Sequence, residues 1–194
     1  MLILEPIAAP GAAVAEAKAY LRIELAGEDA LMARLIAAAA ELCERFTGQV
    51  LLARGFSEIV PASAAWQRIG ATPVRAIVAV EALAADGTAT ALGVGEYAID
   101  IDANGDGWVR VTAAGEAKRV RVSGEAGIAA DWTALPETLR QGILRLAAHL
   151  YAHRDGAGDA GPPAAVSALW RPWRRMPFAI GGRREAASPH AWRS

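Results

Sequence analysis

The sequence predicts an α+β fold: a small helical bundle of two N-terminal helices and a long C-terminal helix, with an inserted antiparallel β region and an extended C-terminal tail. Three observations predict it. Apolar residues recur first with a helical period, from about Val50 with a period of two, and after Pro136 with a helical period again. We therefore expect a domain over residues 1–160, with the β insertion at about 50–125, followed by a linker and tail at 161–194.

Two apolar stripes, separated by the acidic loop "ELAGED" at 24–29, predict the N-terminal helical pair. The first helix, over residues 14–23, has three apolar residues on one face: Val14, Ala17 and Leu21. The apolar face of the second helix carries Leu31, Leu35, Leu42 and Phe46. We expect Asp29 to cap this second helix and Gly48 to end it, because an aspartate accepts hydrogen bonds from a first helical turn and glycine tolerates the backbone conformation that follows a last one.

Alternation of apolar and polar residues predicts the β region. The stretch "VRAIVAV" places four residues on one face: Val74, Ala76, Val78 and Val80. The stretch "EYAIDI" does the same with Tyr97, Ile99 and Ile101. Asp86-Gly87 is typical of a hairpin turn. "WVRV" and "KRVRVSG" continue the alternation, as in strands with one face toward water.

The last predicted helix begins after Pro136, which suits a first helical turn, and ends near Arg154. Its apolar stripe is Leu139, Ile143, Leu146 and Leu150. The glycine-rich stretch "DGAGDAGPP" that follows predicts a linker. We expect a short helix over 163–170, ended by Pro172, and a disordered end at 181–194.

Charge is distributed unevenly along the 194 residues. Residues 1–170 hold 14 Lys and Arg against 20 Asp and Glu, a net charge of −6, whereas residues 171–194 hold six Arg against one Glu, a net charge of +5. An acidic body argues against a nucleic-acid surface there, because phosphate binding needs clustered cations.

The sequence also excludes several other classes of protein. Its apolar runs are far shorter than the roughly 20 residues of a membrane-spanning helix, and the start lacks the basic residues of a secretory signal. We expect a protein of the cytoplasm, or of an assembly made there, with no membrane contact. Its single cysteine, Cys43, falls on the apolar side of a helix and is expected to be an unreactive core residue.

Two patterns resemble metal sites, and neither is complete. Asp102, Asn104, Asp106 and Gly107 match the first half of a calcium loop, but the twelfth position, where the loop needs Glu, is Ala113. A hairpin turn between alternating strands is the simpler interpretation. His149 and His153 lie one helical turn apart without a further metal-ligating partner in the pattern. We also find no nucleophile with a base and no phosphate loop, so we expect no metal, no cofactor and no enzymatic activity.

The stretch "ALWRPWRRMPFAI" at 168–180 combines tryptophans, arginines and prolines without a sustained period. Trp and Arg are enriched where a few side chains carry an interface, so this stretch predicts a docking segment. Two alternatives stay open. Trp170 and Trp173 could fold back over the protein's own helices, or the arginines could form a nucleic-acid-binding arm with stacking tryptophans.

Three stretches stand out when the parts are taken in order: "VAEAKAYLRIELAGEDALMARLIAAAAELCERFTGQVL" at 14–51, "LPETLRQGILRLAAHLYAHRDG" at 135–156 and "PPAAVSALWRPWRRMPF" at 162–178. Together they resemble the head-to-tail connector (adaptor) proteins of long-tailed bacteriophages and of phage-like gene transfer agents. The resemblance covers nearly all of residues 2–180.

The resemblance implies a structural protein that assembles as a ring of about twelve copies beneath the portal and continues the DNA channel toward the tail. Expected partners are the portal protein, neighbouring copies, a tail-side stopper or terminator protein, and DNA passing without sequence-specific binding. The expected location is the head–tail interface of a phage or phage-like particle assembled in the bacterial cytoplasm. The C-terminal segment of the family reaches the portal, a role that falls here on Trp170, Arg171, Trp173, Arg174, Arg175 and Phe178. The main alternative is a small nucleic-acid-binding module that uses the same segment.

Overall fold

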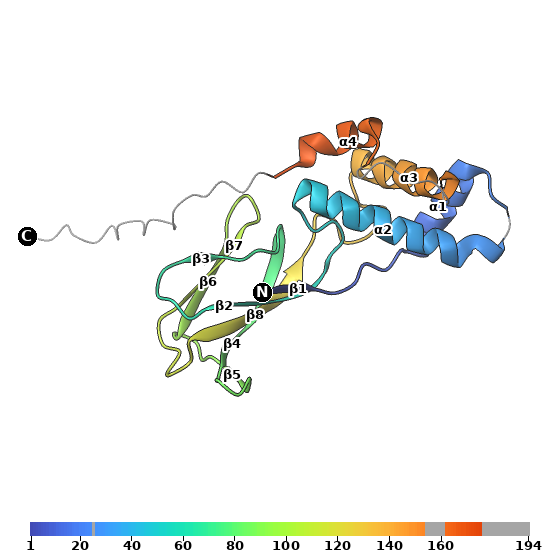
Figure 1. Ribbon diagram of the computed structural model, residues 1–194. Coiled ribbons are helices and arrows are strands. Elements are labelled where there is room, and N and C mark those ends of the chain that lie inside the picture. The colour runs from blue at the N-terminus through green and yellow to red at the C-terminus, as the bar shows by residue number, and fades with distance from the viewer. Residues whose placement is uncertain (25, 154–161, 176–194) are drawn as a thin grey trace, which may run out of the picture.

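The computed structural model describes residues 1–24, 26–153 and 162–175, which form a helical unit and a β unit lying side by side (Figure 1). The α+β class and the antiparallel sheets are as expected. Most of the predicted linker and the final residues 181–194 lie outside the described residues. The third helix ends at Ala152, two residues before the expected Arg154.

The helical unit gathers the helices around one apolar core. Its members are α1 (Gly11–Leu21), α2 (Asp29–Thr47), α3 (Glu137–Ala152) and α4 (Ala164–Trp170), with a 3-10 turn η1 (Ala26–Glu28) before α2. Alanines on α1, α2 and α3 let these helices approach closely, and larger side chains fill the space between them. The fully or almost fully buried residues include Ala13, Ala17, Met32, Ile36, Ala39, Cys43, Leu139, Ile143, Leu146 and Trp170.

The expected cap of α2 is wrong, and its expected apolar stripe is only partly buried, although Leu35, Leu42 and Phe46 pack against the core. Asp29 does not cap the helix; the capping position is Glu28, without a side-chain cap, because η1 leads directly into α2. The Asp29 carboxylate instead accepts a hydrogen bond from Lys18 Nζ at 2.6 Å, which ties α2 to α1. The buried centre also lies one residue beyond each member of the expected stripe, at Met32, Ile36, Cys43 and Thr47. Because α2 packs against three helices, α1, α3 and α4, its most buried residues lie in the middle of its apolar face rather than along one edge of it.

Helix α1 runs from Gly11 to Leu21 rather than over 14–23. The expected end of α2 and the start and stripe of α3 are confirmed. Gly48 follows α2 with a φ of 70°, and its N–H donates to Glu44 O, as a glycine cap does. Pro136 precedes α3, whose stripe from Leu139 to Leu146 is buried.

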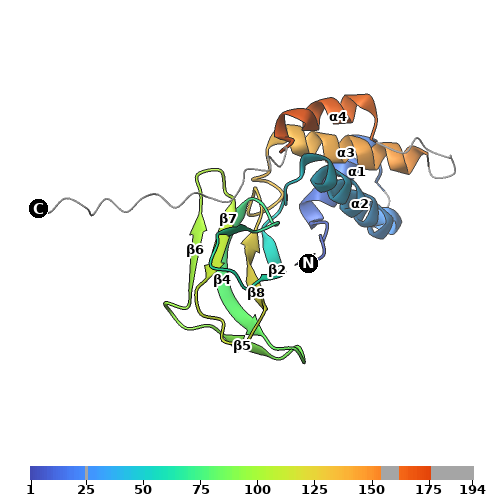
Figure 2. The same ribbon diagram turned by 60° about the vertical axis from the view of Figure 1, so that its left-hand side comes forward.

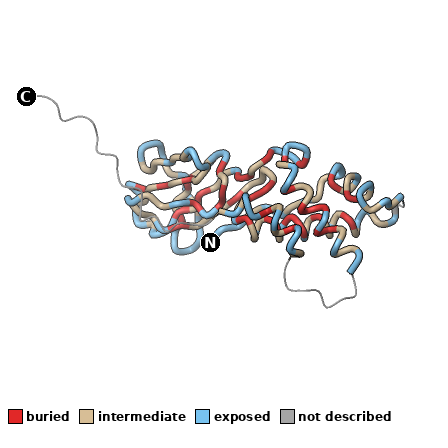
Figure 3. Tube along the Cα trace, turned by 90° about the horizontal axis from the view of Figure 1, so that it is seen from above, coloured by how far each residue is buried: buried red, intermediate tan, exposed pale blue. Residues whose placement is uncertain are grey.

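The β unit consists of two antiparallel sheets. One has the strand order β1-β2-β8-β4-β5 and the other β3-β7-β6. The strands are β1 (Leu2–Leu4), β2 (Arg54–Pro61), β3 (Gln67–Arg68), β4 (Val74–Leu83), β5 (Ala89–Ala91), β6 (Tyr97–Ile101), β7 (Gly107–Val111) and β8 (Arg119–Ala126). The central strand β8 buries Val120 and Val122 completely. Figure 3 shows that buried residues run through both units, so each has its own core.

The expected face of β4 is wrong, whereas the alternation expected for β6 is confirmed. In β4, register shifts between Val74 and Ala76 and between Ile77 and Ala79 break the alternation, and Val78 is 77% exposed. Each bulge adds a residue to one strand and moves the following side chains to the opposite face. In β6 the alternation is kept, but Ile99 and Ile101 are exposed because β6 lies at the edge of its sheet. The hairpin at Asp86-Gly87 is confirmed between β4 and β5.

Short crossings join the two units. The chain passes between them at 5–10, 48–53 and 127–136, and the latter two crossings pair through backbone hydrogen bonds, such as Ala53 N to Ala129 O at 2.8 Å. Glu44 on α2 receives both guanidinium branches of Arg54 at 2.7 and 2.6 Å and the Leu51 N–H at 2.8 Å. These contacts fix the end of α2 against the start of β2.

Candidate functional site

The described part of the tail is a short ordered segment that lies against the body. Helix α4 continues into a 3-10 turn, η2 (Arg171–Trp173), with Pro172 in its first residues. Figure 2 shows α4 lying along α3, with the segment then turning toward the β unit. The short helix and its change at Pro172 are as expected. We call residues 170–175 the root of the C-terminal segment.

Trp170 begins the root and is completely buried in the helical core. Its ring lies 5.9 Å from the ring of Phe46, centroid to centroid, and its indole N–H points to Leu139 O at 3.4 Å. Gly142 makes room for it, because a Cβ there would lie only 2.1 Å from the indole nitrogen. Trp170 could either dock on a partner or fold back over the protein's own helices, and in this structure its ring packs within those helices.

Trp173 is half-buried and contacts α3 and the crossing that follows α2. Its indole N–H donates to Thr138 Oγ1 on α3 at 2.9 Å. Its carbonyl oxygen accepts from Gln49 Nε2 at 2.5 Å, in the crossing that follows α2. Trp173 is therefore held at both ends, by its side chain and by its backbone.

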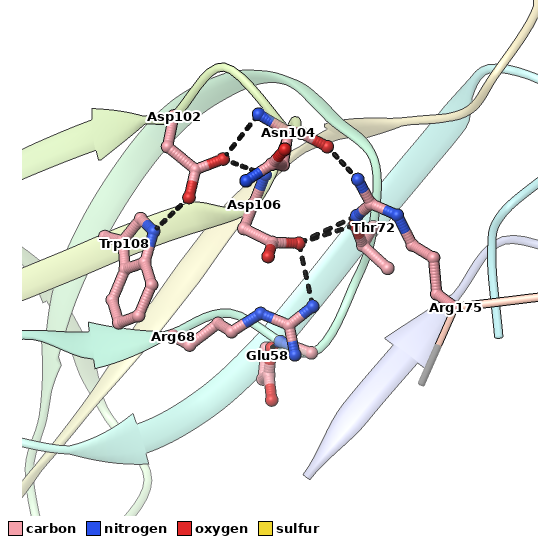
Figure 4. A network of polar contacts seen from close by, with 9 residues as sticks. Glu58, Arg68, Thr72, Asp102, Asn104, Asp106, Trp108 and Arg175 are labelled. Atoms are coloured by element: carbon pink, nitrogen blue, oxygen red, sulfur yellow. Dashed lines mark hydrogen bonds and ion pairs between the residues drawn. The ribbon is translucent and has the colours of Figure 1, made fainter. Parts of the chain in front are cut away.

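Arg175 ends the described chain and reaches the turn between β6 and β7 (Figure 4). Its Nη1 donates to Asp106 Oδ1 at 2.8 Å and to the Thr72 hydroxyl, and its Nη2 donates to the backbone carbonyl of Asn104. The Arg175 N–H donates to Thr47 O, at the end of α2, at 2.8 Å. One residue thus contacts the helical unit through its backbone and the β unit through its side chain.

Asp106 is shared between two arginines. Arg68 Nη2 lies 2.7 Å from the same Oδ1 that receives Arg175, and the Thr72 hydroxyl donates to that oxygen at 3.0 Å. Burial of Asp106 opposes its ionisation, but the hydrogen bonds from Arg68 and Thr72 and the charges of Arg68 and Arg175 outweigh it, so the pKa of this carboxyl is lowered. Asp106 therefore carries its charge at neutral pH.

The calcium-like pattern forms the hairpin turn preferred from the sequence. Asp102 Oδ1 accepts from the N–H groups of Asn104 and Asp106 at 2.8 and 3.0 Å, and Oδ2 accepts from the Trp108 indole at 3.1 Å. Burial of Asp102 raises its pKa, but these hydrogen bonds more than offset that effect, and the pKa is lowered. The polar groups of the pattern thus hold the turn and the Arg175 guanidinium.

The other candidate residues named from the sequence, His149, His153 and Cys43, lie outside this network. The rings of His149 and His153 lie 4.3 Å apart, centroid to centroid, at the end of α3. Within the described ranges no group of three His, Cys, Asp or Glu residues could hold a metal ion, and no helix there is long and apolar enough to cross a bilayer. Cys43 is buried, and burial, with a smaller effect of Glu44, raises the pKa of its thiol.

The remaining predicted docking residues differ in their placement. Arg171 and Arg174 are exposed, and the guanidinium carbon of Arg174 lies 5.8 Å from the centre of the Phe46 ring. Phe178 lies outside the described residues. The structure therefore places Trp170, Trp173 and Arg175 against the body and leaves Arg171 and Arg174 exposed. Sequence reasoning did not identify Asp106, Asn104 and Thr72 as partners of the segment.

No protein-family model and no curated protein matches this chain. Solved structures do match. A chain in the neck of an empty gene transfer agent (GTA) particle with C6 symmetry is 31% identical, with a TM-score of 0.73 over 94% of this chain and 99% of that chain. A chain in the virion of a native GTA particle is 30% identical, with a TM-score of 0.71 over 94% and 98% of the two chains. A third, in the neck of a native GTA particle with C12 symmetry, is 29% identical, with a TM-score of 0.69 over 93% and 99%.

These matches span the helical unit and the β unit together, at an identity that shows common descent as well as a common fold. They are parts of particles, and the resemblance seen in the sequence points to the same place in such a particle. This chain belongs to the head-to-tail connector (adaptor) family of gene transfer agents, as a structural component of the particle neck.

Proposed function

We propose that this protein assembles into a ring of about twelve copies beneath the portal, joins the capsid to the tail and continues the DNA channel. The observation that carries the proposal is the match over almost the whole chain to neck structures with C6 and C12 symmetry. Closed cyclic symmetry requires each copy to present two different faces that fit each other. The partners are neighbouring copies, the portal protein above and a stopper or terminator protein on the tail side.

The portal contact in this proposal is made by the C-terminal segment. Arg171 and Arg174 are exposed on the root, and Phe178 follows a few residues later. Trp170 and Trp173 serve mainly as anchors, because their rings pack and hydrogen-bond within the body. Twelve segments, each binding weakly, would together hold the joint firmly through their high effective concentration.

The channel role agrees with the charge of the body. Residues 1–170 carry a net charge of −6, and a ring of such bodies repels a polyanion, so DNA slides through rather than adheres. The positive charge is gathered after residue 170, in the segment proposed to dock on the portal. The competing function for the same arginines is a nucleic-acid-binding arm. In that case the affinity for DNA should fall steeply as the salt concentration rises.

The test measures binding to the purified cognate portal ring, with duplex DNA as a parallel ligand. A deletion should begin after Arg175, because removing Trp170 would take a buried ring out of the helical core. The full chain is compared with a chain ending at Arg175 and with the double variant Arg171→Glu/Arg174→Glu. The control is Arg34→Glu/Arg145→Glu, which makes the same charge change at two exposed positions on α2 and α3.

We expect the full chain and the control to bind the portal, and the shortened chain and the root variant to bind at least tenfold more weakly, as for the loss of interface anchor residues. Complexes of the full chain should contain about twelve copies per portal when their mass is measured. DNA binding that depends on the root arginines and falls steeply with salt, without portal binding, would support the nucleic-acid arm instead.

A further inference from the structure

We propose that the turn between β6 and β7 is a receptor for the guanidinium of Arg175, and that this contact sets the direction in which the C-terminal segment leaves the body. The proposal rests on the docking function proposed above for that segment. We call the contact the Arg175 clasp, and it consists of Arg175, Asp106, Thr72 and the Asn104 carbonyl. Arg175 is then a positioning residue.

The receptor presents three oxygen acceptors to one side chain. Asp106 supplies the charge, Thr72 supplies a hydroxyl that donates its own proton to Asp106, and Asn104 supplies a backbone carbonyl. A guanidinium has five N–H groups in a fixed planar arrangement, so acceptors at fixed positions select both its place and its orientation. A lysine ammonium offers no such planar fork.

The acceptors are held in place by contacts other than Arg175. Asp102 fixes the turn through the N–H groups of Asn104 and Asp106. Gly105, with a φ of 77°, lies so close to Pro73 that a Cβ at this glycine would be 2.7 Å from Pro73 Cβ. The turn is therefore packed against the residue that follows Thr72, and the receptor has its shape before the arginine enters.

The backbone of Arg175 is fastened as well. Its N–H donates to the carbonyl of Thr47, in the last turn of α2, where helix carbonyls lack partners within the helix. Trp173, two residues earlier, is fixed by Thr138 and Gln49. The chain is thus held at Trp170, Trp173 and Arg175. The clasp, drawn in Figure 4, is the last of these points, and it follows Arg171 and Arg174 and precedes Phe178 in the chain.

A segment held at Arg175 loses less conformational freedom on docking than one that is free from Trp173 onward. Each side chain or short stretch ordered in advance improves affinity severalfold. The clasp therefore predicts that residues far from the portal contact, on the β6–β7 turn, control portal affinity.

The experiment is a double-mutant cycle with Asp106→Asn, Arg175→Gln and the double variant in the full chain. Portal affinity and hydrogen exchange at the Arg175 amide are measured for each. Arg175→Lys keeps the charge and removes the planar fork. Glu116→Gln is the control, since it neutralises an exposed carboxylate of the β unit outside the clasp.

We expect each single variant to speed exchange at residue 175 and to weaken portal binding severalfold, by about two- to tenfold. The double variant should bind no more weakly than either single one, because both remove the same contact. Arg175→Lys should fall between wild type and Arg175→Gln, and Glu116→Gln should match wild type.

Three results would overturn the inference, and they can be told apart. Full portal affinity in Asp106→Asn with a loss in Arg175→Gln would mean that Arg175 contacts the portal directly. Full affinity in both variants, with binding still lost in the chain that ends at Arg175, would mean that the segment docks without the clasp. No portal binding by the full chain would overturn the proposed function, and the inference with it.

Discussion

The helical unit and the β unit are completed by opposite ends of the chain, and they depend on those ends to different degrees. The helical core encloses Trp170, which lies near the C-terminal end of the described chain and is fully buried. The main sheet is extended by β1, a three-residue edge strand whose Leu2 and Ile3 remain exposed. The root of the C-terminal segment is therefore part of the helical core, whereas the N-terminal strand adds an edge to the main sheet.

Trp170→Ala gives the largest effect expected from this difference. Removing a buried tryptophan side chain leaves a cavity between α2, α3 and α4, and should lower the free energy of unfolding by about 3–5 kcal/mol. Urea unfolding followed by circular dichroism measures the loss. Trp173→Ala is the control, because its half-buried ring makes one side-chain hydrogen bond and should cost less than half as much. Equal losses would contradict the distinction between a core residue and a surface anchor.

Glu44→Gln tests the crossing between the units. The Glu44 and Arg54 side chains are only 13% and 10% exposed, and breaking a buried pair leaves an arginine without a charged partner. We expect a loss of about 3 kcal/mol in the free energy of unfolding. Glu41→Gln on the same helix is the matched control: its contact with Arg45 is 3.9 Å long and exposed, so it should cost less than about 1 kcal/mol. If Glu44→Gln proved as mild as its control, the units would be joined by other contacts.

The helical elements could be predicted from the sequence because a helix keeps its period along its whole length. Gly48, the stripe of α3 and the short helix before Pro172 follow from local chemistry. The buried line of α2 was displaced by one residue because three other helices contact it, and tertiary packing has no local signal.

The β unit was harder to predict for a physical reason. One extra residue in a bulge reverses every later side chain, and nothing in "VRAIVAV" indicates where β4 is bulged. Edge and central positions also look alike in sequence, which is why Ile99 and Val122 could not be separated.

The candidate site was predicted in part. Composition singled out the Trp- and Arg-rich segment, and the incomplete calcium pattern was correctly interpreted as a turn. That the two meet through Arg175 and Asp106 could not be predicted, because they lie 69 positions apart and no local pattern relates them.

The pH dependence of unfolding tests the contact between Arg175 of the root and Asp106 of the β unit. The pKa of the Asp106 carboxyl is lowered from 3.8 in the folded protein, so ionised Asp106 stabilises the fold above that pH. This contribution is lost as the pH falls below 3.8 and through the lowered pKa. The pair is partly exposed, so we expect about 1 kcal/mol or less. Thermal unfolding between pH 6 and pH 3 should show a smaller acid-dependent loss in Asp106→Asn than in wild type, while Glu116→Gln should follow wild type. Identical profiles for all three would contradict the assignment.

The smallest effect tests the bulges of β4. If Val78 faced the core, as strict alternation predicts, Val78→Thr would bury a hydroxyl group without a partner. In the structure Val78 is 77% exposed, so the change should alter the free energy of unfolding by no more than about 0.5 kcal/mol. Val122→Thr, the same substitution at a fully buried position of β8, should cost about 1–3 kcal/mol. A Val78→Thr loss as large as that of Val122→Thr would mean that β4 is regular and that its register shifts are wrong. A near-zero loss for Val78→Thr together with a large loss for Val122→Thr would confirm that the two bulges, rather than the hydrophobic pattern, decide which residues of β4 face the core.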